Sequence, residues 1–292
     1  MSSTFGRYVN LSIFGQSHGE AIGITIDGFP AGMVIDQAQL RAEMARRAPG
    51  QSLMTTARKE ADEPEFLSGV LNGRTTGQPI CAIIRNTNQH SKDYGDGVDL
   101  VRPGHADYTG HVRYFGFEDW RGGGSFSGRL TAPIVLAGAL CKQYLETQGV
   151  SIACHIQQLG NICDASFMDD DCTAEDAALR SMTLPVLTNG LDVQMEQAIL
   201  DARNAQDSIG GVLECRATGL PAGLGAPFFD SIESVLSHLL FSIPAVKGVS
   251  FGAGFDFAHM SGSQANDAFY MDNGAVRTRS NNAGGILSLI HI

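Results

Sequence analysis

The chain has 292 residues and a formal net charge of −11, from 20 lysine and arginine residues against 31 aspartate and glutamate residues. Hydrophobic residues make up 43% of it and charged residues 17%, the balance of a globular protein. The acidic balance argues against a general nucleic-acid-binding protein, and the sequence has no run of ~18 apolar residues that could span a membrane. The N-terminus lacks an apolar signal core, and the six cysteines include no C-x-x-C pair. We therefore expect a cytoplasmic protein with free thiols and no metal site.

Short strands and long helices alternate along the chain and predict a mixed α/β fold. Strands are predicted at residues 8–14, 21–26, 80–85 and 211–218, where apolar residues run or alternate between turn-forming residues. Helices are predicted after the N-cap Asp36 and at residues 132–147, 189–205 and 232–240, from apolar residues at helical spacing. Within 189–205, Val193 and Ala198 are expected to face inward. Residues 164–176 are acidic and rich in turn formers, which indicates surface.

A strand–bend–helix pattern occurs twice. The bend G-F-P-A-G at residues 28–32 returns as G-L-P-A-G at 219–223, each after a predicted strand and before a predicted helix. This repeat predicts two halves related by an approximate two-fold axis, with ligand groups gathered where the halves meet. Convergent turn chemistry is the alternative. Residues 251–282 are polar and glycine-rich with interleaved aromatic residues, so they form either a ligand-facing loop or a flexible surface.

The stretch from Arg102 to Ala132 holds two histidines, a triple glycine and paired serines, with almost no aliphatic residue before Leu130. Glycines just before a helix let main-chain N–H groups approach an anion, which the helix dipole favours. From Arg46 to Arg129 the chain carries 11 of its 20 basic residues against 10 acidic ones. These features predict a phosphate or carboxylate site, with a plain structural turn and a solvated basic face as the alternatives.

Several motifs carry a resemblance to one enzyme family. They are FGQSHG at 14–19, RRAPGQS at 46–52, RKEAD at 58–62, IRNTNQHSKDY at 84–94, RPGHADYTG at 102–110, RGGGSFSGRLTA at 121–132, GLPAGLG at 219–225, AVKGVSFGAGF at 245–255 and NNAGGIL at 281–287. In this order they resemble the chorismate synthase family. The resemblance implies helices sandwiched between antiparallel sheets in a homotetramer, and a lyase that eliminates phosphate in a 1,4 sense from 5-enolpyruvylshikimate 3-phosphate. It also implies reduced FMN as cofactor, with NADPH as a possible reductant.

The resemblance also implies roles for individual residues. His18 matches a histidine that protonates the departing phosphate, with Ser17 orienting it, and His105 matches one that protonates the flavin. Histidine suits both tasks because its unperturbed pKa lies near ~6.5. The matched substrate-binding residues are Arg58, Arg102, Arg121 and Arg129, because guanidinium groups bind phosphate and carboxylate in a bidentate way. The matched cofactor-binding residues are Ser125, Phe126, Ser127 and Ala245 for FMN, and Arg47 at a position associated with NADP.

The chain also departs from the family pattern. Many members have arginine in place of Ser125, glutamate in place of Leu130, arginine in place of Leu53 and asparagine in place of Pro244. We expect residues 1–287 to be a single domain, incomplete at its C-terminus, and residues 288–292 to be an artefactual tail. One alternative is therefore a non-catalytic flavin- or anion-binding fragment, inactive as truncated. A phosphotransferase is another, but a Walker lysine is missing from the glycine loop.

Overall fold

The structure is a computed structural model, and it describes residues 3–50, 52, 54–55, 60–87, 101–169 and 176–292. Its N-terminal half is built on a five-stranded antiparallel sheet in the order β1-β2-β3-β7-β4. The strands are β1 (Thr4–Phe5), β2 (Asn10–Gly15), β3 (Ala21–Asp27), β7 (Ile80–Arg85) and β4 (Pro64–Ser68). Every second residue of β3 and β7 is buried, because alternate side chains of a strand point to the same face.

Two helices cover that buried face. They are α1 (Gln37–Arg47) and α3 (Thr131–Thr147), and they share one core with the isoleucines of β3 and β7. The predicted N-cap of α1 is confirmed, because Asp36 Oδ1 accepts hydrogen bonds from the N–H groups of Ala38 at 2.8 Å and Gln39 at 3.0 Å. In α3, the core is met by Leu136 and Leu140, one helical turn apart. This packing fixes the start of α3, where the glycine-rich loop ends.

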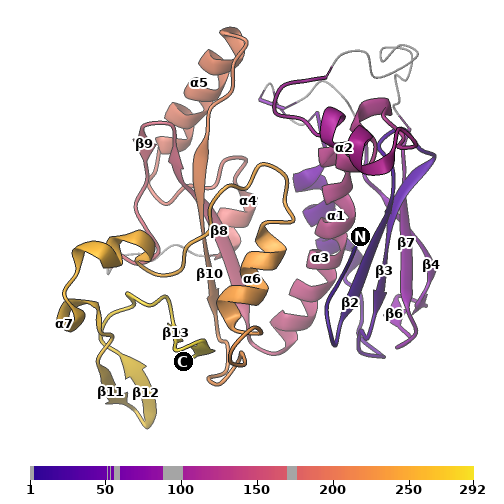
Figure 1. The fold of residues 1–292 in the computed structure, drawn as a ribbon. Helices are drawn as coiled ribbons and strands as arrows, with labels where there is room; N and C mark the ends of the chain where they lie inside the picture. The colour runs from indigo at the N-terminus through magenta and orange to yellow at the C-terminus, as the bar shows by residue number, and fades with distance from the viewer. Residues whose placement is uncertain (1–2, 51, 53, 56–59, 88–100, 170–175) are drawn as a thin grey trace.

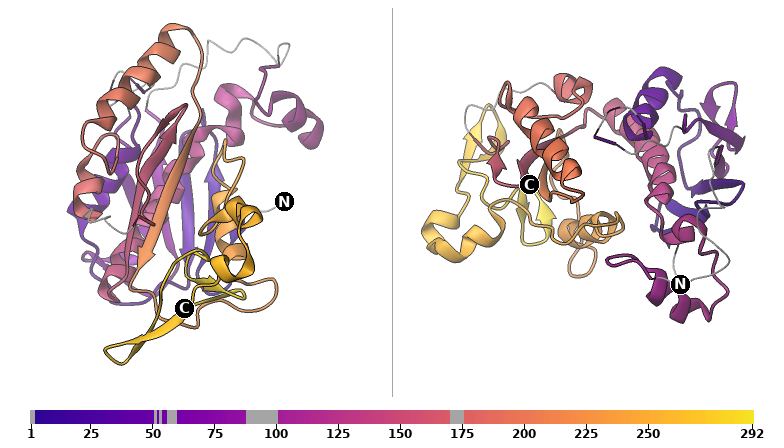
Figure 2. Two further views of the ribbon diagram at one scale, coloured as in Figure 1. Left: turned by 90° about the vertical axis from the view of Figure 1, so that its left-hand side faces the viewer. Right: turned by 90° about the horizontal axis from the view of Figure 1, so that it is seen from above.

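A second antiparallel sheet lies on the other side of these helices, in the order β10-β8-β9. Its strands are β8 (Ser151–Leu159), β9 (Ile162–Cys163) and β10 (Gly211–Thr218). Helix α3 contacts β8 of this sheet as well as β2, β3 and β7 of the first. Figures 1 and 2 show α1 and α3 lying between the two sheets. The predicted mixed α/β fold, with helices sandwiched between antiparallel sheets, is confirmed.

The remaining elements lie around these layers. The helices are α2 (Asp107–Tyr114), α4 (Asp176–Ser181), α5 (Leu191–Asn204), α6 (Ile232–Leu240) and α7 (Gly262–Ala265), with 3-10 turns η2 (Arg121–Phe126), η3 (Gly128–Leu130) and η4 (Gly254–His259). Short strand pairs are β5 (Val70–Leu71) with β6 (Arg74–Thr75), β11 (Phe269–Asp272) with β12 (Ala275–Thr278), and β13 (Ile286–Leu287) with β14 (Ile290–His291). No helix in the described part of the chain is long and apolar enough to cross a membrane.

The two predicted strand–bend–helix units are both present. One runs from β3 to α1, and the other runs from β10 to α6. Their helices differ in environment, because α1 buries Leu40 and Met44 whereas α6 has no buried residue. The second unit begins its helix at Ser231, whose side chain accepts from Ser234 N–H. In α5 the inward prediction for Val193 is wrong: Val193 is 65% exposed, and the adjacent helical face buries Met195.

Candidate active site

The triple glycine forms the centre of the site. Gly122, Gly123 and Gly124 have φ values of 59°, 82° and 54°, a region that side-chain-bearing residues rarely adopt. A Cβ on Gly122 would lie 2.4 Å from His18 Nε2, and one on Gly123 would lie 2.8 Å from His105 Nε2. Consecutive glycines therefore face the two histidines that the sequence predicts to be catalytic. The glycine loop brings the two imidazoles to one place.

His18 lies in a buried turn that follows β2. Ser17 and His18 are only 1% and 6% exposed, and the Ser17 N–H donates to the Gly124 carbonyl at 3.1 Å. Asn86, at the end of β7, donates its side-chain amide to the carbonyls of Gln16 at 3.0 Å and Gly19 at 2.8 Å. The turn is thus held from both sides, and His18 is fixed against the glycine loop.

His105 is oriented by a carboxylate two residues further along. Asp107 Oδ1 lies 2.6 Å from His105 Nδ1, and it also accepts from Arg102 Nη2 at 2.8 Å. Asp107 Oδ2 accepts from the backbone N–H of Arg102 at 2.9 Å and from its Nε at 2.8 Å. These hydrogen bonds from Arg102 hold the pKa of Asp107 far below its usual value, although burial opposes them. An ionised Asp107 requires the proton on Nδ1, so Nε2, which faces Gly123, is the nitrogen that can exchange a proton.

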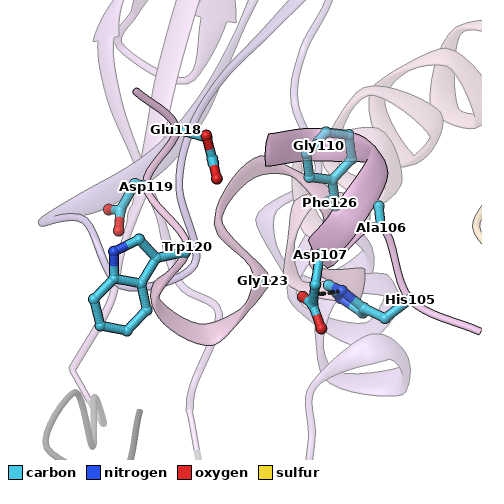
Figure 3. A pocket seen from close by; sticks show the side chains of 9 residues that line it. All are labelled: His105, Ala106, Asp107, Gly110, Glu118, Asp119, Trp120, Gly123 and Phe126. Atoms are coloured by element: carbon cyan, nitrogen blue, oxygen red, sulfur yellow. Dashed lines mark ion pairs between the residues drawn. The ribbon is translucent and has the colours of Figure 1, made fainter. Parts of the chain in front are cut away.

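A small pocket opens beside His105 (Figure 3). Its lining combines carboxylates with aromatic and glycine residues: His105, Ala106, Asp107, Gly110, Glu118, Asp119, Trp120, Gly123 and Phe126. In Asp119 both carboxylate oxygens accept from Arg121, at 2.8 Å each from Nε and Nη2. That pairing lowers the pKa of Asp119, burial opposes it, and the charge of His18 adds to the lowering. The carboxylate of Asp119 therefore binds Arg121 and also interacts electrostatically with His18.

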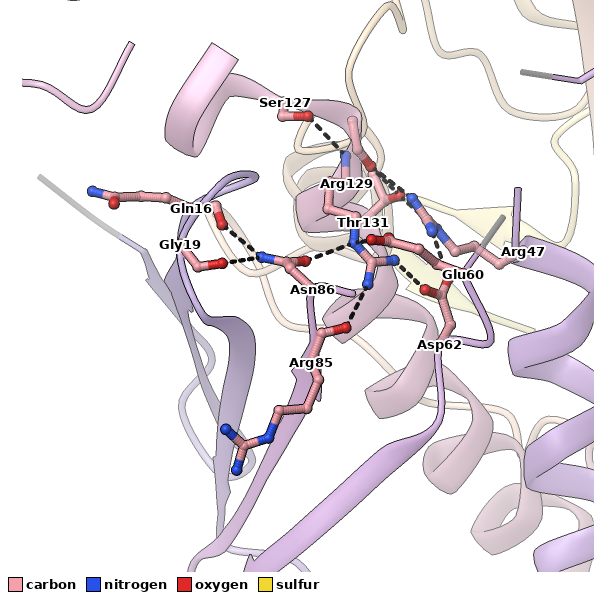
Figure 4. Close-up of polar contacts among 11 residues, drawn as sticks. Gln16, Gly19, Arg47, Glu60, Asp62, Arg85, Asn86, Ser127, Arg129 and Thr131 are labelled. Atoms are coloured by element: carbon pink, nitrogen blue, oxygen red, sulfur yellow. Dashed lines mark hydrogen bonds and ion pairs between the residues drawn. The ribbon is translucent and has the colours of Figure 1, made fainter. Parts of the chain in front are cut away.

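Arg129 and Arg47 meet at one buried carboxylate (Figure 4). Asp62, 2% exposed, pairs one oxygen with Arg129 Nη1 and the other with Arg47 Nη1, the latter at 2.6 Å. Glu60 Oε2 lies 2.9 Å from Arg129 Nε, and Asn86 Oδ1 accepts from the same nitrogen at 3.1 Å. Arg129 is 5% exposed. Its guanidinium group therefore connects the 60–62 segment to the end of β7 and, through Asn86, to the turn that carries His18.

Arg47 also holds the entrance to α3, because its Nη2 donates to the Gly128 carbonyl at 3.1 Å and its Nε to Thr131 Oγ1 at 3.4 Å. In the same loop, Ser127 Oγ accepts from Arg129 N–H at 3.3 Å. Phe126 packs against α2, since a Cβ on Gly110 would meet its ring at 2.6 Å.

The remaining predicted site residues are placed as follows. Ser125 is exposed within the glycine loop, whereas Ala245 is exposed after α6 with φ 71°. In the described part of the chain, Ala245 makes no hydrogen bond or ion pair with the glycine loop. Arg58 lies outside the described residues, as does Leu53. The described residues also contain no group of three His, Cys, Asp or Glu side chains placed to hold a metal ion.

Comparison with known proteins identifies the family. The model of the chorismate synthase family matches residues 9–291. The chain belongs to the chorismate synthase family. Chorismate synthase from Parabacteroides distasonis is 45% identical over 285 residues, covering 97% of this chain and 78% of that protein. Chorismate synthase from Dehalococcoides mccartyi is 42% identical over 287 residues, covering 98% of this chain and 78% of that protein.

A solved structure agrees with these relatives. A crystal structure of chorismate synthase superposes with a TM-score of 0.80 at 28% identity, covering 98% of this chain and 80% of the other. In this chain, the motifs shared with the chorismate synthase family singled out the histidines and arginines of the candidate site. They did not single out Asp107, Glu60, Asp62, Asn86 and Asp119, which hold those side chains in position. The signal for two of them was available in RKEAD, where carboxylates follow the cations at once.

Proposed function

We propose that this member of the chorismate synthase family eliminates phosphate from 5-enolpyruvylshikimate 3-phosphate in a 1,4 sense and forms chorismate. The observation that supports this most directly is the placement of His18 and His105 against consecutive glycines of one loop. An elimination that releases phosphate and a ring proton needs two positioned proton-transfer groups, and imidazoles suit that task near neutral pH.

The substrate carries a phosphate and two carboxylates, so its binding requires several cations. Arg102 and Arg121 are partly exposed, with 46% and 44% of each side chain accessible, and each is aligned by a carboxylate. We infer that these two guanidinium groups meet the anionic groups of the substrate. Arg129 is buried among Glu60, Asp62 and Asn86, which supports a role in holding the site together. Its role in binding substrate stays a prediction from the family resemblance.

Proton handling follows from the two histidine environments. His18 is buried beside Gly122 and close enough to Asp119 for their charges to interact, and we propose that its imidazole donates a proton to the departing phosphate. His105 keeps its Nδ1 proton on Asp107 and offers Nε2 for exchange. Ser17, bound through its N–H to the glycine loop, holds the His18 turn at a fixed distance from that loop.

The glycine loop also fits a reduced flavin. The three successive glycines let the loop approach His18 and His105 closely, and Ser125 and Phe126 beside them are exposed and free to meet a ligand. Ser125, Phe126 and Ser127 would hold the flavin from this loop, with Ala245 as a further contact. Reduced FMN would supply electron density that weakens the carbon–oxygen bond and would recover it afterwards. NADPH as the reductant at Arg47, a homotetrameric assembly and a cytoplasmic location are further proposals that follow from the family.

The test is an anaerobic assay of the purified chain with FMN, dithionite and 5-enolpyruvylshikimate 3-phosphate, in which chorismate absorbance and released phosphate are followed together. We expect equal amounts of the two products, and a loss of about 10²-fold or more in kcat for His18→Asn and for His105→Asn. His238→Asn, at an exposed position of α6, serves as the control and should retain activity. The proposal is wrong if phosphate appears without chorismate, or if neither site variant lowers the rate.

A further inference from the structure

Two cysteines lie directly opposite each other in the second sheet. Cys154 of β8 is paired with Cys215 of β10 in the antiparallel register. Five of the six cysteines fall in the described residues, and all five are free thiols. Cys215 is exposed and Cys154 is half-buried. Because Cys215 is exposed, small oxidants in solution can reach it.

The register places this pair where the two strands approach most closely. The Ile156 N–H donates to the Pro185 carbonyl at 2.8 Å, so it points away from β10. Alternate N–H groups of a strand point the same way, and Cys154 is two residues from Ile156. Cys154 and Cys215 therefore form a non-hydrogen-bonded pair, for which the Cα atoms lie about 4.5 Å apart and the side chains are close. That separation lies within the range of about 4.4–6.8 Å that a disulfide spans.

The surroundings divide the two thiols into an attacking and a resolving partner. The interaction with the Cys215 thiol lowers the pKa of the Cys154 thiol, whose Sγ also lies 3.9 Å from the His155 carbonyl to which it donates. Burial opposes that effect, the positive charge of Arg46 adds to it, and the negative charge of Glu214 opposes it. The same interaction raises the pKa of Cys215, and the partial burial of its sulfur within an otherwise exposed residue and the charges of Cys154 and Glu214 act in the same direction. Cys154 is therefore the thiol with more thiolate, which is the nucleophilic form.

We propose that Cys154 and Cys215 are a reversible oxidation site that closes to a cross-strand disulfide in the presence of a hydroperoxide. The Cys154 thiolate attacks one peroxide oxygen, the O–O bond breaks, and with hydrogen peroxide the products are Cys154 sulfenic acid and hydroxide. The Cys215 thiol then attacks the Cys154 sulfur, its proton leaves with the sulfenic oxygen as water, and the S–S bond forms. Two thiols are oxidised, one peroxide is reduced, and a thiol reductant reverses the change.

Arg46 relates the cysteine pair to the framework of the candidate site. Arg46, whose charge acts on Cys154, precedes Arg47, which holds Asp62 and the Gly128 carbonyl. Formation of the disulfide removes the charge of the Cys154 thiolate that interacts with Arg46, and it joins β10 covalently to β8. The inference does not depend on the proposed reaction, because it concerns the thiols alone.

The test exposes the full chain to hydrogen peroxide without FMN or substrate, and then measures free thiols in denaturant and the intact mass. We expect the thiol count to fall from six to four, the mass to fall by about 2 Da for the two hydrogens lost, and dithiothreitol to restore both. Peptide mapping of this unmutated protein should join Cys154 to Cys215. A cross-link between any other cysteines, or no thiol loss at a peroxide concentration that oxidises glutathione, overturns the proposal.

Single substitutions separate the two roles. Cys215→Ser should leave Cys154 as a sulfenic acid, seen as a gain of about 16 Da that dimedone traps, and Cys154→Ser should leave Cys215 unoxidised at the same dose. Cys163→Ser, at an exposed cysteine of β9, is the matched control and should still lose two thiols. A loss of about 2 Da that persists in either Cys154→Ser or Cys215→Ser contradicts the pairing. The peptide map of the unmutated chain decides the question if a variant fails to fold.

Discussion

The carboxylate of Asp107 offers the sharpest test of how the site is organised. Its two oxygens accept one hydrogen bond from His105 and three from Arg102. Asp107→Asn keeps the size of the side chain but replaces one oxygen with an NH₂ group. If that group faces His105, the imidazole must accept through Nδ1 and carry its proton on Nε2, the wrong tautomer for exchange at Gly123. If it faces Arg102, two charge-assisted hydrogen bonds are lost.

The size of the effect follows from the exposure of the imidazole. Positioned acid–base groups contribute about 10²–10⁴-fold, and a wrong tautomer removes most of that. His105 is partly exposed, with 27% of its side chain accessible, so a water molecule can replace some of the hydrogen bonding that Asp107 provides. We therefore expect the lower end: kcat falls about 10²-fold, which is roughly 2.7 kcal/mol, and KM rises by no more than ~3-fold through Arg102.

The assay is the anaerobic production of chorismate, measured for Asp107→Asn alone and in a His105→Asn background. If Asp107 acts through the imidazole, its substitution costs ~10²-fold in the first case and at most ~3-fold in the second. Glu65→Gln removes a carboxylate from an exposed pair with Arg85 and should leave kcat unchanged. An equal loss of kcat in both backgrounds would refute the positioning role.

Three further predictions concern the framework of the site. Gly122→Ala places a Cβ against His18 at φ 59° and should lower kcat at least ~10²-fold. Gly138→Ala, at an exposed position of helix α3, should instead raise the free energy of unfolding by about 0.5–1 kcal/mol and leave kcat unchanged. Equal behaviour of the two variants in activity and in urea unfolding would contradict this. Asp62→Asn leaves the guanidinium groups of Arg47 and Arg129 without the buried charge that they share, and it should lower the free energy of unfolding in urea by about 3–5 kcal/mol. A decrease below ~1 kcal/mol would show that these ion pairs are dispensable for stability. The pKa of Asp107 is lower in the folded than in the unfolded chain, so its stabilising contribution is complete above pH ~4 and declines as the pH falls further. In Asp107→Asn, the free energy of unfolding should therefore fall less steeply with pH below pH ~4. An unchanged pH dependence in this range would count against the pairing with Arg102.

Local patterns predicted the parts of the fold that depend on neighbouring residues. Short apolar runs between turn-forming residues predicted β3 and β7, and the cap at Asp36 predicted the start of α1, because strand patterns and capping each act over a few residues. The inward face of α5 was predicted wrongly at Val193, since an isolated amphipathic pattern does not say which neighbour covers it. The same limit applies to α6, whose apolar face is exposed in the structure: the periodicity shows that the face is apolar, but it does not show what the face contacts.

The sequence motifs picked out the histidines, arginines and glycines of the candidate site, but not the carboxylates and the amide that hold these residues in place. Histidine, arginine and glycine carry recognisable chemistry in short motifs, and the structure brings His18 and His105 together at the loop those motifs indicated. The ion pair between Arg129 and Asp62 joins residues 67 positions apart in the sequence, and the hydrogen bond between Arg47 and Gly128 joins residues 81 positions apart. Pairings over such distances depend on how sheet and helices assemble, so no local spacing reveals them.

The carboxylates would let this acidic protein keep its arginine donors aligned for the anionic substrate that we propose. Asp119 binds the Nε and Nη2 edge of Arg121, and that edge alone, because a bidentate carboxylate matches one side of a planar guanidinium group. The other side keeps its N–H donors, now fixed in direction instead of moving with a flexible side chain. A phosphate or carboxylate arriving at that side meets an aligned donor without displacing Asp119. The entropy of ordering the arginine has then been lost during folding, and binding does not lose it again.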